Sequence, residues 1–119
     1  MKNDLKARTF KFSLNVISLV EMLPKTKAAG VVSYQILKSG TSVGANYRAA
    51  RRARSDKEFI SKINIVLEEA DETLFWLEVI QAKKWIENEL LDVLLKEADE
   101  LTAIFTSTLI TMNRKKIRT

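Results

Sequence analysis

Apolar side chains recur at steps of three and four residues along nearly the whole chain, and this spacing constrains the fold more than any other feature. Such steps place the apolar groups on one face of an α-helix, whereas a strand would show alternation at every second position. The 119 residues include only three glycines and one proline, so the turns that an all-β fold needs are missing. The pattern predicts long amphipathic helices in one domain.

The apolar pattern is divided into four segments. We expect helices over about residues 4–23, 26–53, 56–84 and 87–114. Pro24 ends the first, because the residue before a proline avoids the helical conformation. Ser55-Asp-Lys-Glu58 matches a capping box, which marks the start of the third. Short connections make neighbouring helices antiparallel, so we predict an all-α, antiparallel up-and-down four-helix bundle over residues 1–119.

Two glycines, Gly40 and Gly44, lie inside the second helix. Each costs about 1 kcal/mol relative to alanine in a helix interior. Their spacing of one turn indicates that another helix backbone approaches closely there, and the alternative is a break near Gly40. We favour the continuous helix.

The apolar faces of the first and third helices are wider than one bundle needs. The first carries Phe10, Leu14 and Ile17 beside its main stripe, and the third carries a second stripe of Ile60, Leu67, Leu74 and Trp85. Apolar surface of this width exceeds what one neighbouring helix can cover. We therefore expect contacts between subunits.

Charge is segregated along the sequence. Residues 1–62 contain thirteen Lys or Arg and four Asp or Glu, whereas residues 63–111 contain three and eleven. The last eight residues add Arg114, Lys115, Lys116 and Arg118. Two interpretations stay open: helix faces of opposite sign that pair within the bundle or between subunits, or a basic surface for phosphate backbones.

Composition excludes several classes of chemistry. The chain has no Cys and no His, so it has no disulfide, no Cys/His metal site and no His-based relay. Ser39, Thr41 and Ser42 therefore have no His to act as base, and the spacing from Gly40 to Gly44 does not match a phosphate loop. We expect no enzymatic activity and no cofactor.

Carboxylates cluster on the third and fourth helices, where bundles can hold metals. A ferritin-like site requires Glu-x-x-His pairs, which this chain cannot provide, so only an all-carboxylate site stays conceivable. The best apolar run, residues 12–23, contains Asn15 and Glu21 and is too short to span a bilayer. We expect a cytoplasmic protein that does not interact with membranes.

The candidate binding segment is Tyr47-Arg-Ala-Ala-Arg-Arg-Ala-Arg54, followed by Lys57. Like charges this close on a helix repel one another by a few tenths of a kcal/mol per pair, so an anion should offset them. Guanidinium groups suit carboxylate and phosphate equally well. The candidate residues for nucleic-acid binding are Arg48, Arg51, Arg52, Arg54 and Lys57.

Three blocks carry a family resemblance: Gln35-Ile-Leu-Lys-Ser-Gly-Thr-Ser-Val-Gly-Ala-Asn46, Ser55-Asp-Lys-Glu-Phe-Ile-Ser-Lys-Ile63 and Glu69-Ala-Asp-Glu-Thr-Leu-Phe-Trp-Leu77. With them the chain resembles the four-helix-bundle proteins of intervening sequences in bacterial 23S ribosomal RNA genes. The resemblance implies a left-handed bundle that assembles as a homopentamer, without established enzymatic activity. Related proteins include the accessory factor of diversity-generating retroelements, which binds nucleic acid and a reverse transcriptase.

This chain departs from the common family pattern after Asn46, where many members continue with Ile-x-Glu-Gly and this chain continues with Tyr47-Arg-Ala-Ala-Arg51. We expect Ser42 and Asn46 to hydrogen-bond across a helix interface rather than contact a ligand. We expect Glu72 to pair with a base on the second helix. The structural motif is thus Gly40, Ser42, Gly44, Asn46 and Glu72.

Two functional hypotheses follow. The first is an oligomer that binds RNA or DNA through its Arg-rich face. The second is a structural or protein-interaction scaffold without nucleic-acid binding, in which the Arg cluster pairs with the acids of residues 68–72 across subunit interfaces. A protein partner is compatible with both.

Overall fold

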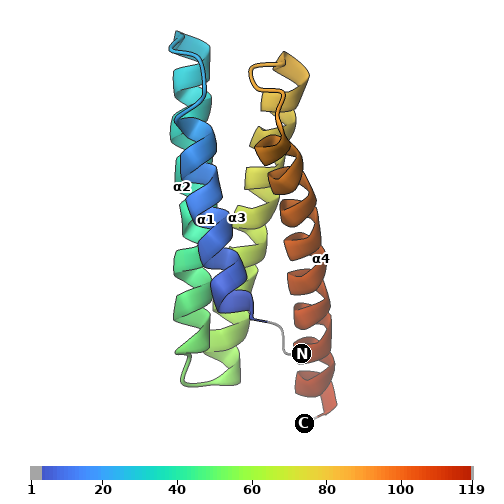
Figure 1. Ribbon diagram of the computed structural model, residues 1–119. Helices are drawn as coiled ribbons and strands as arrows, with labels where there is room; N and C mark the ends of the chain where they lie inside the picture. Colours follow the sequence, from blue (N-terminus) through green and yellow to red (C-terminus); the bar gives the residue numbers. More distant parts are fainter. Residues whose placement is uncertain (1–3, 119) are drawn as a thin grey trace.

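The computed structural model describes residues 4–118, and their side chains as far as residue 115. Four helices follow one another: α1 (Leu5–Val20), α2 (Lys27–Arg51), α3 (Asp56–Lys83) and α4 (Glu89–Arg118). They run alternately up and down, so the predicted antiparallel four-helix bundle is confirmed (Figure 1). Lys116 and Arg118, which belong to the predicted basic C-terminal residues, lie outside the described side chains.

Local capping fixes where the helices begin. The side chains of Asp4, Thr26 and Ser55 each accept a hydrogen bond from a backbone N–H in the first turn of α1, α2 and α3, respectively. Asn88 does the same for α4, because its Oδ1 accepts from the N–H of Leu91 at 2.9 Å. These side chains satisfy N–H groups that have no partner inside the helix.

The predicted ends of α1 and α4 differ from the structure by more than two residues. α1 ends at Val20 rather than near residue 23, because the chain tightens before Pro24. There the N–H groups of Met22 and Leu23 bond to carbonyl oxygens three residues back, at 2.9 and 3.1 Å. α4 continues to Arg118 rather than ending at residue 114. No glycine or proline interrupts it, and lysine and arginine are good helix formers that suit a helix C-terminus.

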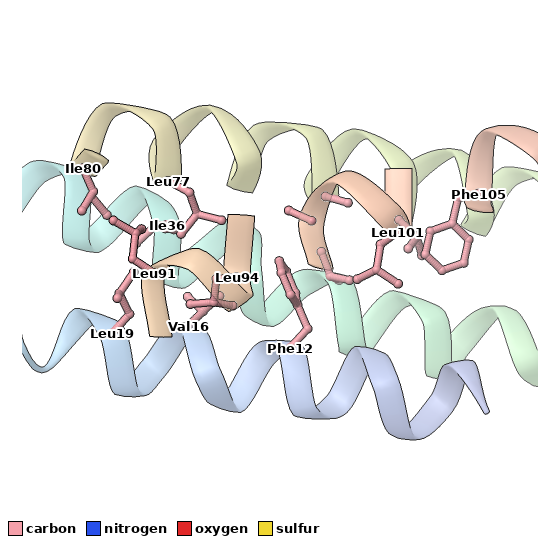
Figure 2. Close-up of a cluster of buried hydrophobic side chains, with 14 of the residues drawn as sticks. Phe12, Val16, Leu19, Ile36, Leu77, Ile80, Leu91, Leu94, Leu101 and Phe105 are labelled. Atoms are coloured by element: carbon pink, nitrogen blue, oxygen red, sulfur yellow. The ribbon is translucent and has the colours of Figure 1, made fainter. Parts of the chain in front are cut away.

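The core is a continuous column of aliphatic and aromatic side chains along the bundle axis (Figure 2). Phe12, Val16 and Leu19 of α1 meet inward-facing residues of the other three helices there. On α4 the buried residues recur at steps of three and four from Leu91 to Leu109. Burial of these apolar side chains is the main force that holds the four helices together.

The two interior glycines of α2 lie against α1, and α2 is continuous through both. An ideal Cβ on Gly40 would lie 2.8 Å from both Cγ atoms of Val16. A Cβ on Gly44 would lie 2.8 Å from Ser13 Oγ and 3.1 Å from the Thr9 carbonyl oxygen. The predicted close approach of a second helix is therefore confirmed, and its partner is α1.

The helices do not pack equally around the bundle. α2 packs extensively on α1 and on α3, and α3 packs extensively on α4, whereas α1 and α4 approach each other much less closely. A groove of about 490 Å³ opens between α1 and α4, with Phe12 among its lining residues. The bundle therefore has one loose side, which we call the α1–α4 seam.

Candidate nucleic-acid interface

The turn between α2 and α3 is held by its own backbone and by two side chains. The N–H groups of Arg52 and Ala53 bond to carbonyl oxygens of the last turn of α2 at 3.1 and 3.0 Å. Ser55 Oγ accepts from the Glu58 N–H at 3.0 Å, and Glu58 Oε1 accepts from the Arg54 N–H at 2.7 Å. The Glu58 carboxylate therefore binds the backbone of the turn.

This fixed turn positions the five predicted binding residues. All of their side chains are exposed, and they lie over the last turn of α2, the connecting turn and the first turn of α3. None of them forms a salt bridge with a carboxylate among the side chains described up to residue 115. We call this surface the basic corner: Arg48, Arg51, Arg52, Arg54 and Lys57.

Aromatic residues of α1, α2 and α4 lie beside the basic corner. The Arg48 guanidinium carbon lies 5.9 Å from the centroid of the Phe10 ring on α1, within the range of a cation–π contact. The Tyr47 ring packs against Phe105 of α4, with centroids 5.6 Å apart. Burial raises the pKa of Tyr47, and the nearby positive charge of Arg51 opposes that rise. The Arg48 guanidinium group is thus held against an aromatic ring, although Arg48 as a whole is exposed.

Two residues of the predicted structural motif behave differently from expectation. Asn46 Nδ2 donates to Ser42 Oγ at 2.7 Å and to the Ser42 carbonyl oxygen at 3.0 Å, so both partners lie on α2. The prediction of a bond across a helix interface was wrong. A spacing of four residues on a helix brings two side chains together on one face, and the amide uses the nearest acceptor.

Glu72 also has a different partner. Its carboxylate accepts a hydrogen bond from Trp76 Nε1 at 3.2 Å, one turn along α3, and forms no salt bridge among the described side chains. Within one chain, the expected pairing of Glu72 with a base on α2 is therefore not formed. Glu72 lies on an exposed face, where the indole N–H of the same helix is the closer donor.

The bond that does connect α2 and α3 joins Ser39 and Thr73. The two hydroxyl oxygens lie 2.8 Å apart, and both residues are buried. Ser13 of α1 similarly donates to the Gly40 carbonyl oxygen at 2.8 Å. Sequence reasoning missed both bonds, although hydroxyl residues at core positions of an apolar stripe were a signal for them.

The acids at residues 68–72 lie further along α3 than the basic corner, which is at the start of that helix. Glu68 and Asp71 line an open groove of about 740 Å³ between α3 and α4, together with Asp99. Burial and then the charges of Glu72 and Glu68 raise the pKa of Glu69, which Lys38 partly offsets. Within one chain, none of the acids at residues 68–72 forms a salt bridge with the basic corner.

The α1–α4 seam has a cross-link of its own. Arg8 of α1 donates to Glu97 from Nε at 2.9 Å and from Nη2 at 2.7 Å, and it reaches Glu100 at 3.1 Å. The hydrogen bond to Glu97 raises the pKa of Arg8. Such a two-pronged contact is geometrically specific. Arg8 is thereby occupied and is not part of the basic corner.

An apolar face lies beside the basic corner, between α1 and α2. Phe10, Leu14 and Ile17 are 53%, 44% and 37% exposed and line a groove of about 250 Å³ that reaches Arg48. Their recurrence at steps of four and three residues makes a continuous stripe on α1. The predicted excess of apolar surface on the first helix is therefore present on the single chain.

Two other features, a cluster of metal ligands and a membrane-spanning helix, are absent from the described part of the chain. No group of three or more acidic residues there is arranged to hold a metal ion. None of the helices within residues 4–118 combines the length and apolar character needed to cross a membrane.

The comparisons with known proteins agree with this fold. The model of the 23S rRNA-intervening sequence protein family matches residues 1–107, and the match ends inside α4, before Arg114 and Lys115. A crystal structure of a protein of unknown function from the S23 ribosomal protein family of Bacteroides thetaiotaomicron VPI-5482 superposes with a TM-score of 0.81. The two chains are 35% identical, over 89% of this chain and 98% of that one. No curated protein matches.

Proposed function

The chain belongs to the 23S rRNA-intervening sequence protein family, and from that premise we propose that it is a non-enzymatic homo-oligomer of the cytoplasm that binds nucleic acid. The observation that carries the proposal is the basic corner: five exposed cations on and beside the α2–α3 turn, without a described carboxylate partner. The oligomer would be a pentamer, as the resemblance to the family implies.

The electrostatics of the basic corner favour an external anion. Four guanidinium groups and one ammonium group repel one another on a surface about two helical turns long. The acids nearest in sequence are engaged elsewhere, since Glu58 accepts from the Arg54 N–H and Asp56 contacts Lys115 of α4. Phosphates would relieve the repulsion, and planar guanidinium groups bind them in a two-pronged geometry.

Charge complementarity supports assembly of several copies. α1 and α2 contain seven Lys or Arg and no Asp or Glu, whereas α3 contains seven acids and three bases. The apolar, basic α1–α2 face of one copy would fit the acidic groove between α3 and α4 of the next. Such a contact joins two different faces, and contacts of that kind close into rings when the rotation allows.

The test of binding is a salt titration with a short RNA duplex, its single strand and a DNA duplex, measured by fluorescence anisotropy. If phosphate contacts dominate binding, the logarithm of the binding constant falls linearly with the logarithm of the salt concentration. The slope of this line, which we call the salt slope, is about 0.7 to 0.9 per phosphate contact. The variant Arg51→Ala/Arg52→Ala should bind more weakly and with a lower slope. The control Lys25→Ala/Lys27→Ala removes the same charge from exposed residues at the opposite end of the bundle. Absence of binding by the unmodified protein at low salt would overturn the proposal.

A scaffold without nucleic-acid binding is the second candidate. It is favoured by the contact of Arg48 with Phe10, which joins the basic corner to the exposed apolar face of α1. If the corner is a subunit contact, then Arg51→Glu should dissociate the oligomer. If the corner binds phosphate, the same variant should keep its oligomeric mass and lose binding. Size-exclusion chromatography with light scattering separates the two.

A further inference from the structure

The end of α4 returns to the same end of the bundle as the basic corner. α4 runs antiparallel to α3, so its last turns lie beside the first turn of α3 (Figure 1). One contact fixes this placement: Lys115 Nζ of α4 lies 3.4 Å from Asp56 Oδ2, the first residue of α3. Residues almost 60 positions apart in the sequence are thereby neighbours.

This contact changes the charge of the basic corner. Asp56 lies in sequence between Arg54 and Lys57, so an uncompensated carboxylate there would repel a phosphate. Lys115 offsets that negative charge from the neighbouring helix. Both side chains are well exposed, at 62% and 66%, so the pair adds little stability of its own. Its main effect is on the potential at the surface.

Arg114 adds a further exposed cation on the same turn of α4, and no described carboxylate pairs with it. The helix dipole alone is a reason to place bases at the end of α4. It does not account for the contact of Lys115 with Asp56, which places the end of α4 against the start of α3, where the basic corner lies.

The dimensions of the bundle suit a longer contact. The molecule measures 52 × 27 × 21 Å, so its end is 27 Å across in the longer direction. A duplex advances about 3.4 Å per base pair along its axis, so that end is as wide as roughly eight base pairs are long. A single turn between two helices would use only part of this width.

From this arrangement we infer that Arg114 and Lys115 of α4 form a second part of the nucleic-acid interface and extend the basic corner across the end of the bundle. The inference rests on the proposed function. It names as partner a phosphate backbone long enough to contact both the α2–α3 turn and the end of α4.

The experiment uses the full chain and the same three nucleic-acid probes. Arg114→Ala/Lys115→Ala should lower the salt slope by about 1 to 2, as expected for the loss of one or two phosphate contacts. The control Lys25→Ala/Lys27→Ala, with an equal change of charge, should leave the slope within 0.5 of the unmodified protein, about half of one contact. Asp56→Asn should tighten binding, because it removes the carboxylate that Lys115 offsets.

The outcomes distinguish this inference from the proposed function. The inference is overturned if Arg114→Ala/Lys115→Ala binds like its control while Arg51→Ala/Arg52→Ala binds weakly, and the proposed function then stands. It is also overturned if Asp56→Asn leaves affinity unchanged or weakens it. If the unmodified protein binds none of the probes, the proposed function fails, and the inference fails with it. Unchanged melting of each variant shows that a loss of binding is not a loss of fold.

Discussion

Replacement of Gly40 by alanine would place a methyl group where α1 leaves no room for it. The added Cβ would lie 2.8 Å from both Cγ atoms of Val16 and 3.0 Å from its Cβ. Val16 is fully buried, and a β-branched side chain in a helix has essentially one rotamer, so it cannot turn away. The two helices would have to separate. Gly44→Ala should act in the same direction, because the backbone carbonyl of Thr9 lies 3.1 Å away.

Two opposing effects set the magnitude. Alanine is the better helix former by about 1 kcal/mol. Overpacking of a well-packed site costs about 1 to 3 kcal/mol. Gly40→Ala should therefore lower the free energy of unfolding by about 0 to 2 kcal/mol. Gly30, also in α2, has nothing within 4 Å of its added Cβ, so Gly30→Ala should gain up to about 1 kcal/mol. The two variants should differ by roughly 1 to 3 kcal/mol.

The assay is thermal unfolding followed by far-ultraviolet circular dichroism. At about 4 °C per kcal/mol for a domain of this size, Gly40→Ala should melt roughly 4 to 12 °C below Gly30→Ala. All variants must be compared at one protein concentration, since association raises apparent stability. If Gly40→Ala melts at or above Gly30→Ala, the close approach of α1 and α2 does not constrain the chain as described here.

Three further predictions concern other side chains and use the same unfolding measurement. Thr73→Val should lower the free energy of unfolding by about 1 to 3 kcal/mol, because the buried Ser39 hydroxyl keeps only its long hydrogen bond to the Ile36 carbonyl oxygen. The double variant Ser39→Ala/Thr73→Val should recover part of that loss. Ser55→Ala should cost about 1 kcal/mol through the lost cap of α3, whereas exposed Ser61→Ala should not destabilise. Glu69→Gln should stabilise at neutral pH but not below the ordinary pKa of a glutamate. The raised pKa of Glu69 means that the folded state binds its proton more tightly, so stability falls as pH rises through that window; an equal effect at both pH values would contradict this.

The sequence predicts most of this fold because its signals are local. Ser55 and Glu58 mark the start of α3 within four residues, and the apolar stripes give the inward face of each helix. The end of α1 was misplaced by about three residues, because Pro24 tightens the preceding turn. The effect of a proline on its predecessors depends on how that turn packs, which local rules do not contain.

Partners across helices were harder to predict. Gly40 and Gly44 predicted a close neighbour but not which helix it would be. Ser42 and Asn46 could bond along one helix or between two, and only the rotation of α2 in the bundle decides this. The same holds for the basic corner. Its exposure in one chain follows from the fold, but the approach of Lys115 depends on where α4 ends.

The α1–α4 seam also has a consequence for how the chain reaches its fold. The extensive contacts are all between helices that follow one another in sequence, and only the seam joins helices that do not. Chains whose contacts are local in sequence fold quickly, since each hairpin forms at a small entropic cost. The Arg8–Glu97 contact, in contrast, joins residues 89 positions apart. Closure of the seam would therefore come last in folding, and the two helices that border it, α1 and α4, would exchange their amide hydrogens before α2 and α3 in the native state.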